Sequence, residues 1–174
     1  MSWDSGRAAQ AARPERYGRA VMADQVVIEH PNRAQPAAQL ARVLVIALLI
    51  ASAAVVLIVT VGGWATIEGA KSIQIAYIAV YFVFALFVAR WARGVLPMIA
   101  ALAVILGVFG VVAAPGWFAR DKTGFTDPGL ASSVLGALCV LLVVLQVGLI
   151  LAALVGFRQR WNVEVERTLE PAPA

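Results

Sequence analysis

Four long stretches of the chain contain no charged residue and no histidine. They cover residues 43–61, 73–89, 95–114 and 130–157. The hydrocarbon core of a bilayer is about 30 Å thick, and a helix needs roughly 20 apolar residues to cross it. The first three stretches match that length. The fourth, at ~1.5 Å per residue, is longer than the core is thick, so its helix must tilt or protrude.

The same stretches favour helices over strands. Strands of a membrane barrel alternate apolar and polar residues, and these stretches do not alternate. In hydrocarbon, each backbone amide of a helix finds its partner within that helix. We therefore expect an all-α fold, an integral membrane four-helix transmembrane bundle over residues 42–158. A polar, largely flexible tail (1–41) precedes it, and a second tail (159–174) follows.

Residues at the ends of the stretches suggest where the helices begin and end. We expect Ser72 to cap the second helix and Pro97 to lie in the first turn of the third. Pro115 is expected to end the third helix, and Asp127 with Pro128 to start the fourth. Four tryptophans follow the C-terminal ends of the four stretches, where an indole suits the headgroup level. We expect these interfacial anchors to be Trp64, Trp91, Trp117 and Trp161.

The distribution of basic residues predicts the orientation. Cytoplasmic loops of membrane proteins carry an excess of Lys and Arg. With four crossings, the two tails and the short 90–94 connection share one side. That side carries Arg33, Arg42, Arg90, Arg93, Arg158, Arg160 and Arg167, against Lys71, Arg120 and Lys122 on the other. We expect both termini in the cytoplasm, with the protein in the inner or plasma membrane.

The start of the chain contains no apolar core of a secretory signal, since the first apolar stretch begins at Val43. We expect no cleaved signal, and Met22 also opens a plausible shorter chain. The net charge of +4 comes from basic residues in tails and loops, so we expect no nucleic-acid partner. Ala-, Val- and Arg-rich usage with few lysines indicates a GC-rich, bacterial genome.

The stretches lack the residues that several membrane chemistries require. Coupled ion transport usually needs an ionisable group within the membrane, and none is present there. The only histidine, His30, lies in the N-terminal tail, so we expect no haem, other cofactor or metal ion. The only cysteine, Cys139, is interpreted as a small apolar residue of the helix interior. We expect no catalysis of the protein's own.

Gln146 is the one strongly polar residue deep within a stretch. An amide in hydrocarbon requires a partner, so we expect an inter-helix hydrogen bond, for which Tyr77 and Tyr81 are candidates. A role in lining a solute path is the alternative. Small residues recur every four positions and predict close helix packing, although Gly and Ala are frequent here in any case. These are Ala103 with Gly107, and Gly148 with Ala152 and Gly156.

Two segments outside the stretches could make contacts. Arg120, Asp121 and Lys122 lie in the longest outer connection, where they could contact a partner protein or lipid headgroups, or simply be solvated. Residues 162–166 alternate like a short strand, and 26–28 could be another, so the two tails could pair.

These observations predict a non-catalytic accessory, scaffolding or assembly component of a membrane complex, in contact with lipid and with another membrane protein or a second copy. One alternative is a subunit of an oligomeric channel or transporter for an uncharged solute. A weaker alternative is a membrane enzyme that acts at the outer headgroup level through Arg120, Asp121 and Lys122.

Overall fold

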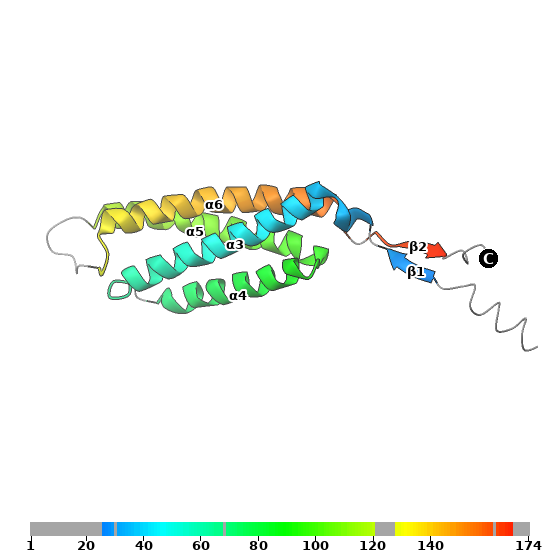
Figure 1. The fold of residues 1–174 in the computed structure, drawn as a ribbon. Helices are drawn as coiled ribbons and strands as arrows, with labels where there is room; N and C mark the ends of the chain where they lie inside the picture. Colours follow the sequence, from blue (N-terminus) through cyan, green and yellow to red (C-terminus); the bar gives the residue numbers. More distant parts are fainter. Residues whose placement is uncertain (1–25, 30, 68, 121–127, 162, 169–174) are drawn as a thin grey trace, which may run out of the picture. The chain divides into compact units, whose positions relative to one another are not determined.

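The computed structural model describes residues 26–29, 31–67, 69–120, 128–161 and 163–168 (Figure 1). It divides into two units, a helical unit over residues 32–162 and a smaller unit formed by both tails. Each is described by itself. Of the flexible tail expected over residues 1–41, residues 1–25 and His30 lie outside the described residues, as do Asp121 and Lys122.

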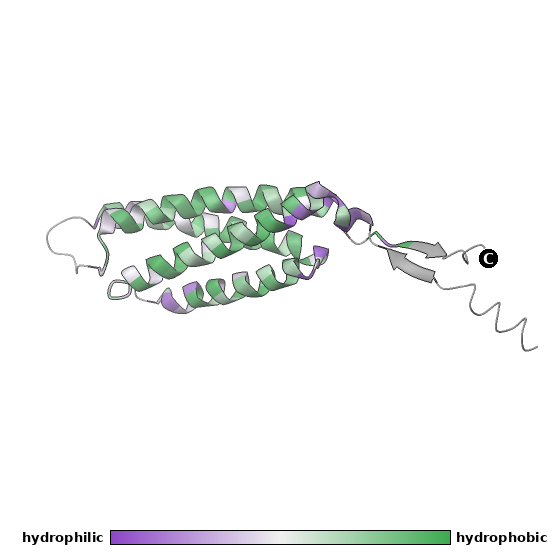
Figure 2. Ribbon diagram, viewed as in Figure 1, coloured by the Kyte–Doolittle hydropathy of each residue, from purple (hydrophilic) through white to green (hydrophobic). Residues whose placement is uncertain are grey.

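The helical unit contains four helices that are long and apolar enough to cross a membrane. They are α3 (Pro36–Gly62), α4 (Lys71–Ala89), α5 (Leu96–Phe118) and α6 (Ser132–Arg158). Short 3-10 turns precede α3 (η1, Pro31–Ala34) and α5 (η2, Arg93–Val95). Hydrophobic residues extend along each helix, and polar residues gather near the helix ends (Figure 2).

The ends of the uncharged stretches do not coincide with the ends of the helices. The helix α3 begins at Pro36, within the segment expected to be tail, because proline suits the first turn and Gln39 and Arg42 are good helix formers. The helix α5 continues through Pro115 to Phe118, so the expected end at Pro115 is wrong. Within the last turn this proline removes a single backbone hydrogen bond, and its own carbonyl accepts one from Ala119 N at 2.9 Å.

Two expected helix starts are also wrong. The helix α4 begins at Lys71 with Ala70 in the capping position, and Ser72 provides no cap. The helix α6 begins at Ser132 after Ala131, so Pro128 lies before its first turn. Pro97 lies in the first turn of α5, as expected.

The helix α3 connects the others. The helices α5 and α6 pack along each other, while α3 packs against α6 on one side and α4 on the other. Figure 1 shows α4 beside α3, with α5 and α6 together on the far side of α3. Over its most apolar 18 residues, α4 buries the smallest share of the four helices and α3 the largest. The attachment of α4 therefore depends mainly on α3.

The tails form a two-stranded antiparallel sheet. Strand β1 (Val26–Glu29) pairs with β2 (Val165–Thr168), with Val26 opposite Thr168 and Glu29 opposite Val165. The expected pairing of the tails is confirmed, although the C-terminal strand begins later than Asn162. These two strands are the exception to the helical structure of the described residues.

Candidate functional site

A buried hydrogen-bond network joins three helices near their middles. Gln146 of α6 is only 1% exposed, and Ser52 of α3 and Tyr81 of α4 are fully buried. Tyr81 Oη donates a hydrogen bond to Gln146 Oε1 at 2.8 Å. Gln146 Nε2 donates to Ser52 Oγ at 2.9 Å. Both ends of the amide are therefore paired, and its pairing ties α4 and α3 to α6.

Of the two candidate tyrosines, the structure brings only Tyr81 into contact with Gln146. Tyr77 lies one turn earlier and presents its ring edge-on to Tyr81, with the ring centroids 5.9 Å apart. On its other side it contacts Phe109 of α5 in the same manner, at 6.4 Å. Sequence reasoning missed Ser52, whose one signal is a hydroxyl within the small-residue segment 51–54 of α3.

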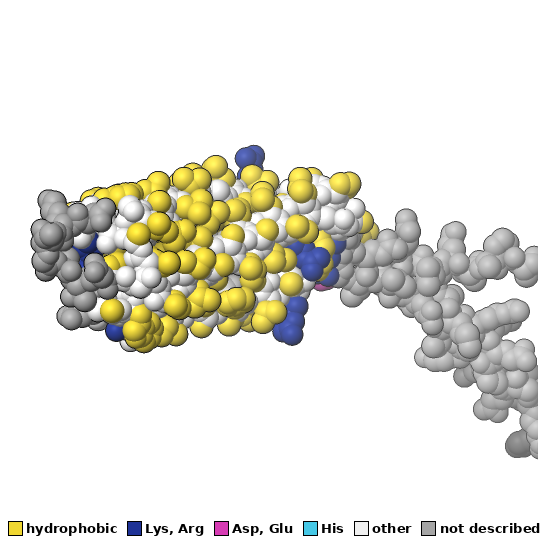
Figure 3. Space-filling model, turned by 60° about the vertical axis from the view of Figure 1, so that its left-hand side comes forward, with side chains coloured by type: hydrophobic (Ala, Val, Ile, Leu, Met, Phe, Trp, Pro, Cys, Tyr) yellow, Lys and Arg dark blue, Asp and Glu magenta, His cyan; other side chains and the backbone are white. Residues whose placement is uncertain are grey.

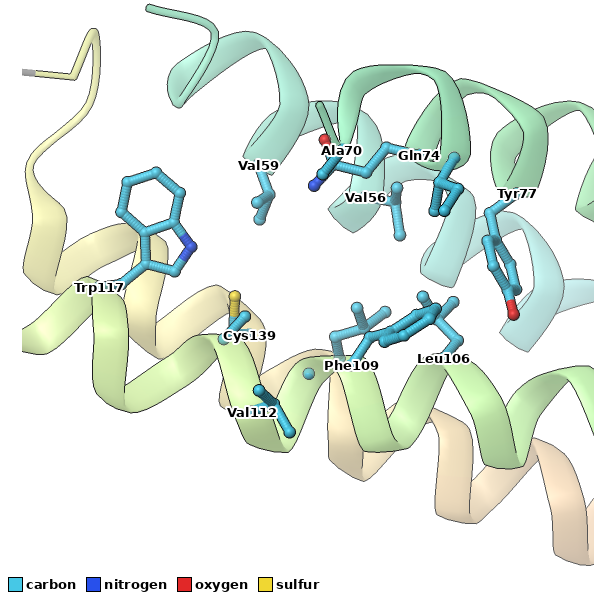
Figure 4. A pocket seen from close by; sticks show the side chains of 14 residues that line it. Val56, Val59, Ala70, Gln74, Tyr77, Leu106, Phe109, Val112, Trp117 and Cys139 are labelled. Carbon is cyan, nitrogen blue, oxygen red and sulfur yellow. The ribbon is translucent and has the colours of Figure 1, made fainter. Parts of the chain in front are cut away.

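A pocket of about 310 Å³ lies beside this network, bounded by all four helices (Figure 4). Most of its wall is apolar. The lining residues are Val56, Val59, Ala70, Ile73, Gln74, Tyr77, Leu106, Phe109, Gly110, Val112, Ala113, Trp117, Cys139 and Leu142. Ile73 of α4 and Val112 of α5 are 52% and 72% exposed. The pocket therefore opens sideways between α4 and α5.

The pocket has few polar groups, with the Trp117 indole at one end, the Tyr77 ring and its hydroxyl at the other, and the Gln74 side chain between them (Figure 4). The Gln74 amide oxygen lies 2.9 Å from Thr60 Oγ1, which also lies 2.7 Å from the Val56 carbonyl. A hydroxyl has one proton, so Thr60 donates to one of these acceptors at a time. Trp117 is 8% exposed. Its indole nitrogen points into the pocket (Figure 4), and no described residue accepts a hydrogen bond from it.

Small residues set the close approach of α5 to α6. Ala103 is fully buried. A Cβ on Gly107 would lie 3.5 Å from Gln146 Cβ, an ordinary contact. A Cβ on Gly110 would lie 2.9 Å from Val143 Cγ2 and 3.2 Å from the Cys139 carbonyl oxygen, which leaves no room for it.

The predicted stripe on α6 has several neighbours. A Cβ on Gly148 would lie 3.8 Å from Leu48 of α3, and one on Gly156 would lie 3.1 Å from Trp161 Cζ2. Ala152, between them, is buried. The stripe therefore lies against α3 at its first residue, Gly148, and against Trp161 at its last, Gly156.

An arginine–tryptophan cluster closes the end of the helical unit where α4 ends. Trp91 has φ = 62°, in the left-handed region. It follows α4 in a Schellman turn, in which Ala92 N donates to the Phe87 carbonyl and Trp91 N to the Val88 carbonyl, each at 3.0 Å. Glycine is usual at this position. The cost of placing tryptophan there must be offset by contacts of its indole.

Those contacts come from α3 and from the residues after α6. The Arg42 guanidinium lies 4.5 Å from the Trp91 ring centroid and donates to the Ala89 carbonyl. The fully buried Trp161 packs edge-on against Trp91 at 5.5 Å. Arg93 Nε donates to the Phe157 carbonyl at 2.8 Å. The cluster thus joins the ends of three helices.

The four tryptophans differ in exposure. Trp64 is 50% exposed, with Lys71 Nζ 4.6 Å from its ring centroid, while Trp117 and Trp161 are buried. The Arg120 guanidinium lies 5.5 Å from the Trp117 ring centroid. Lys and Arg side chains lie toward the ends of the unit, and the surface between them is mostly hydrophobic (Figure 3). The anchoring role of the tryptophans stays a prediction.

Within the described ranges, no three His, Cys, Asp or Glu side chains gather as metal ligands would. The chain matches no known protein family, no curated protein and no solved structure. Its function must therefore be argued from the geometry alone.

Proposed function

We propose that this chain is a non-catalytic integral membrane protein, a four-helix transmembrane bundle with both termini in the cytoplasm. Its proposed role is that of an accessory, scaffolding or assembly component of a membrane complex. The observation that carries the proposal is the pairing of the Gln146 amide oxygen with Tyr81 and of its amide nitrogen with Ser52. An amide whose oxygen and nitrogen are both hydrogen-bonded to other helices holds those helices together. It is not free to bind a passing solute, which favours a structural role over a role in lining a transport path.

The orientation is supported by both ends of the chain. The tails pair as β1 and β2, and Asn32 Nδ2, before α3, donates to the Arg160 carbonyl, after α6, at 3.0 Å. These contacts support the proposal that both ends lie on one side of the membrane, as an even number of crossings requires. Arginine is concentrated at that side, and the positive-inside rule makes it cytoplasmic.

The helix α4 is the proposed contact for a partner. It depends mainly on α3 for support and has exposed apolar side chains, among them Phe82 at 49% and Leu86 at 61%. Helices in a membrane associate through packing and polar contacts, without a hydrophobic driving force between them. A partner helix that lies along α4 would cover the apolar side chains of α4 that α5 leaves exposed.

Site-specific photo-crosslinking in intact cells tests this proposal. A crosslinking amino acid at Phe82 is expected to give one discrete adduct, whose partner also co-purifies with the unmodified chain in mild detergent at a fixed ratio. The matched control is Val144, which is 62% exposed on α6 and is expected to give lipid adducts only. Equal, diffuse adducts at both positions, with no fixed-ratio partner, would contradict the proposal.

A further inference from the structure

The lateral pocket between α4 and α5 has the form of a ligand site. Its volume of about 310 Å³ falls at the lower end of ligand pockets, which are mostly apolar with a few placed polar groups. An α-helix with its side chains is about 10 Å across and is too thick to enter it. The occupant must be a thin, flexible and apolar molecule.

The Trp117 end of the pocket offers a hydrogen-bond donor. The Trp117 side chain is more than nine-tenths buried, its N–H points into the pocket, and no described residue accepts from it. The nitrogen itself is open to the pocket, since Arg42 Nε is the one buried side-chain nitrogen or oxygen without a partner among the described residues. The Trp117 N–H is therefore available to an acceptor on a ligand. The occupant that fits should therefore carry an acceptor oxygen near Trp117 and an apolar portion beyond it.

The direction of the pocket matches that of a lipid in one leaflet. Its lining on α5 runs from Trp117, near the helix end, to Leu106. At ~1.5 Å per residue this is about 16 Å, close to half of a hydrocarbon core about 30 Å thick. The Tyr77 ring, packed against Phe109, lies at the inner end (Figure 4). The Trp117 end is thus near the membrane surface and the Tyr77 end near the midplane.

We propose that this pocket binds one acyl chain of a diacyl phospholipid, with the ester carbonyl of that chain accepting a hydrogen bond from the Trp117 indole N–H. The chain enters sideways between Ile73 and Val112, and the Gln74 amide lies beside the ester region. The inference rests on the membrane-spanning arrangement proposed above, and not on any partner protein.

Native mass spectrometry of the full chain in detergent tests the site with two added lipids, a diester phosphatidylcholine and its diether analogue, which lacks the carbonyls. We expect one bound lipid and a preference for the diester of about fivefold, the effect of one hydrogen bond of ~1 kcal/mol. In the Trp117→Phe variant the two lipids should bind equally. Equal binding to the unaltered protein would overturn the hydrogen bond.

A second variant tests occupancy of the pocket itself. Ala70 lines the pocket and is exposed, so Ala70→Phe fills the pocket without changing buried helix packing, and we expect at least tenfold weaker lipid binding. Val104→Phe, at a position of α5 that is 51% exposed and lies outside this lining, is the control and should bind normally. Unchanged binding by Ala70→Phe, or retention of added palmitic acid in place of the phospholipid, would overturn the proposal. If no partner protein crosslinks at Phe82, the proposed accessory function fails, but the lipid-binding measurement keeps its meaning. The two proposals can therefore be rejected independently.

Discussion

Tyr81 of α4 and Gln146 of α6 share a hydrogen bond of 2.8 Å although 65 positions separate them in the sequence. Since α4 is otherwise supported mainly by α3, this bond is its polar link to the α5/α6 pair. The ring of Tyr81 fills the space between the helices, and its hydroxyl reaches the one amide available on α6.

Removing that bond should loosen α4. We expect Tyr81→Phe and Gln146→Leu each to lower the free energy of unfolding, with a coupling of ~0.5–1.5 kcal/mol between them, as for other inter-helix hydrogen bonds. Equilibrium unfolding in mixed micelles measures both variants and the double variant. Tyr77→Phe is the matched control, because the Tyr77 hydroxyl has no described partner, and it should be nearly neutral. A coupling near zero would show that Gln146 does not hold the helices together.

The approach of α5 to α6 depends on Gly110. A methyl group there would lie 2.9 Å from Val143 Cγ2 and 3.2 Å from a backbone oxygen, so Gly110→Ala should destabilise the protein by ~1–3 kcal/mol. Gly116 on the same helix has open space around it, and Gly116→Ala should be neutral or slightly stabilising. Thermal unfolding in detergent compares the two variants, and equal effects would mean that α5 and α6 are not in this contact.

Because Trp91 adopts a left-handed backbone conformation, we expect its glycine variant to be more stable than its alanine variant. Both Trp91→Ala and Trp91→Gly lose the packing on Trp161 and Arg42. Alanine also retains the strain at φ = 62°, which glycine does not. Trp91→Gly should therefore be the more stable of the two by ~1 kcal/mol. The reverse order of melting temperatures would argue against the Schellman turn.

Arg42 should be sensitive to a change that preserves its charge. Its guanidinium contacts the Trp91 ring and the Ala89 carbonyl together, a combination that suits the planar group of arginine and not an ammonium group. Arg42→Lys should lower stability by ~1 kcal/mol, the value of a partly desolvated cation–π contact. Arg90→Lys is the control, because that side chain is exposed. Equal melting temperatures for both variants would contradict the role given to Arg42.

The sequence predicts the four helices because uncharged stretches as long as a membrane is thick are rare outside membrane-spanning helices. It predicts their ends less well. Charge-free stretches mark the thickness of hydrocarbon, whereas a helix continues while its residues tolerate helical geometry, as Gln39 and Arg42 do at the start of α3. Pro115 is a misleading signal because a proline in a last turn removes one hydrogen bond only.

The candidate site is predictable in part. A lone amide in an apolar stretch predicts a partner, and the sequence offers Tyr77 and Tyr81 as candidates without deciding between them. Ser52 does not, because a serine in a membrane helix can also bond to its own backbone. The pocket depends on the spacing of α4 from α5, which is set by side-chain packing. No local pattern in the sequence encodes that spacing.

Labelling from outside intact cells tests the central claim, four crossings with both ends in the cytoplasm. In a Cys139→Ala background, Ala65→Cys places a thiol in the α3–α4 connection and Gly94→Cys one between α4 and α5, at positions that are both exposed. A membrane-impermeant maleimide should label the Ala65→Cys variant in intact bacterial cells, and the Gly94→Cys variant only after the membrane is opened. Labelling of both variants in intact cells, or the opposite pattern, would contradict this account.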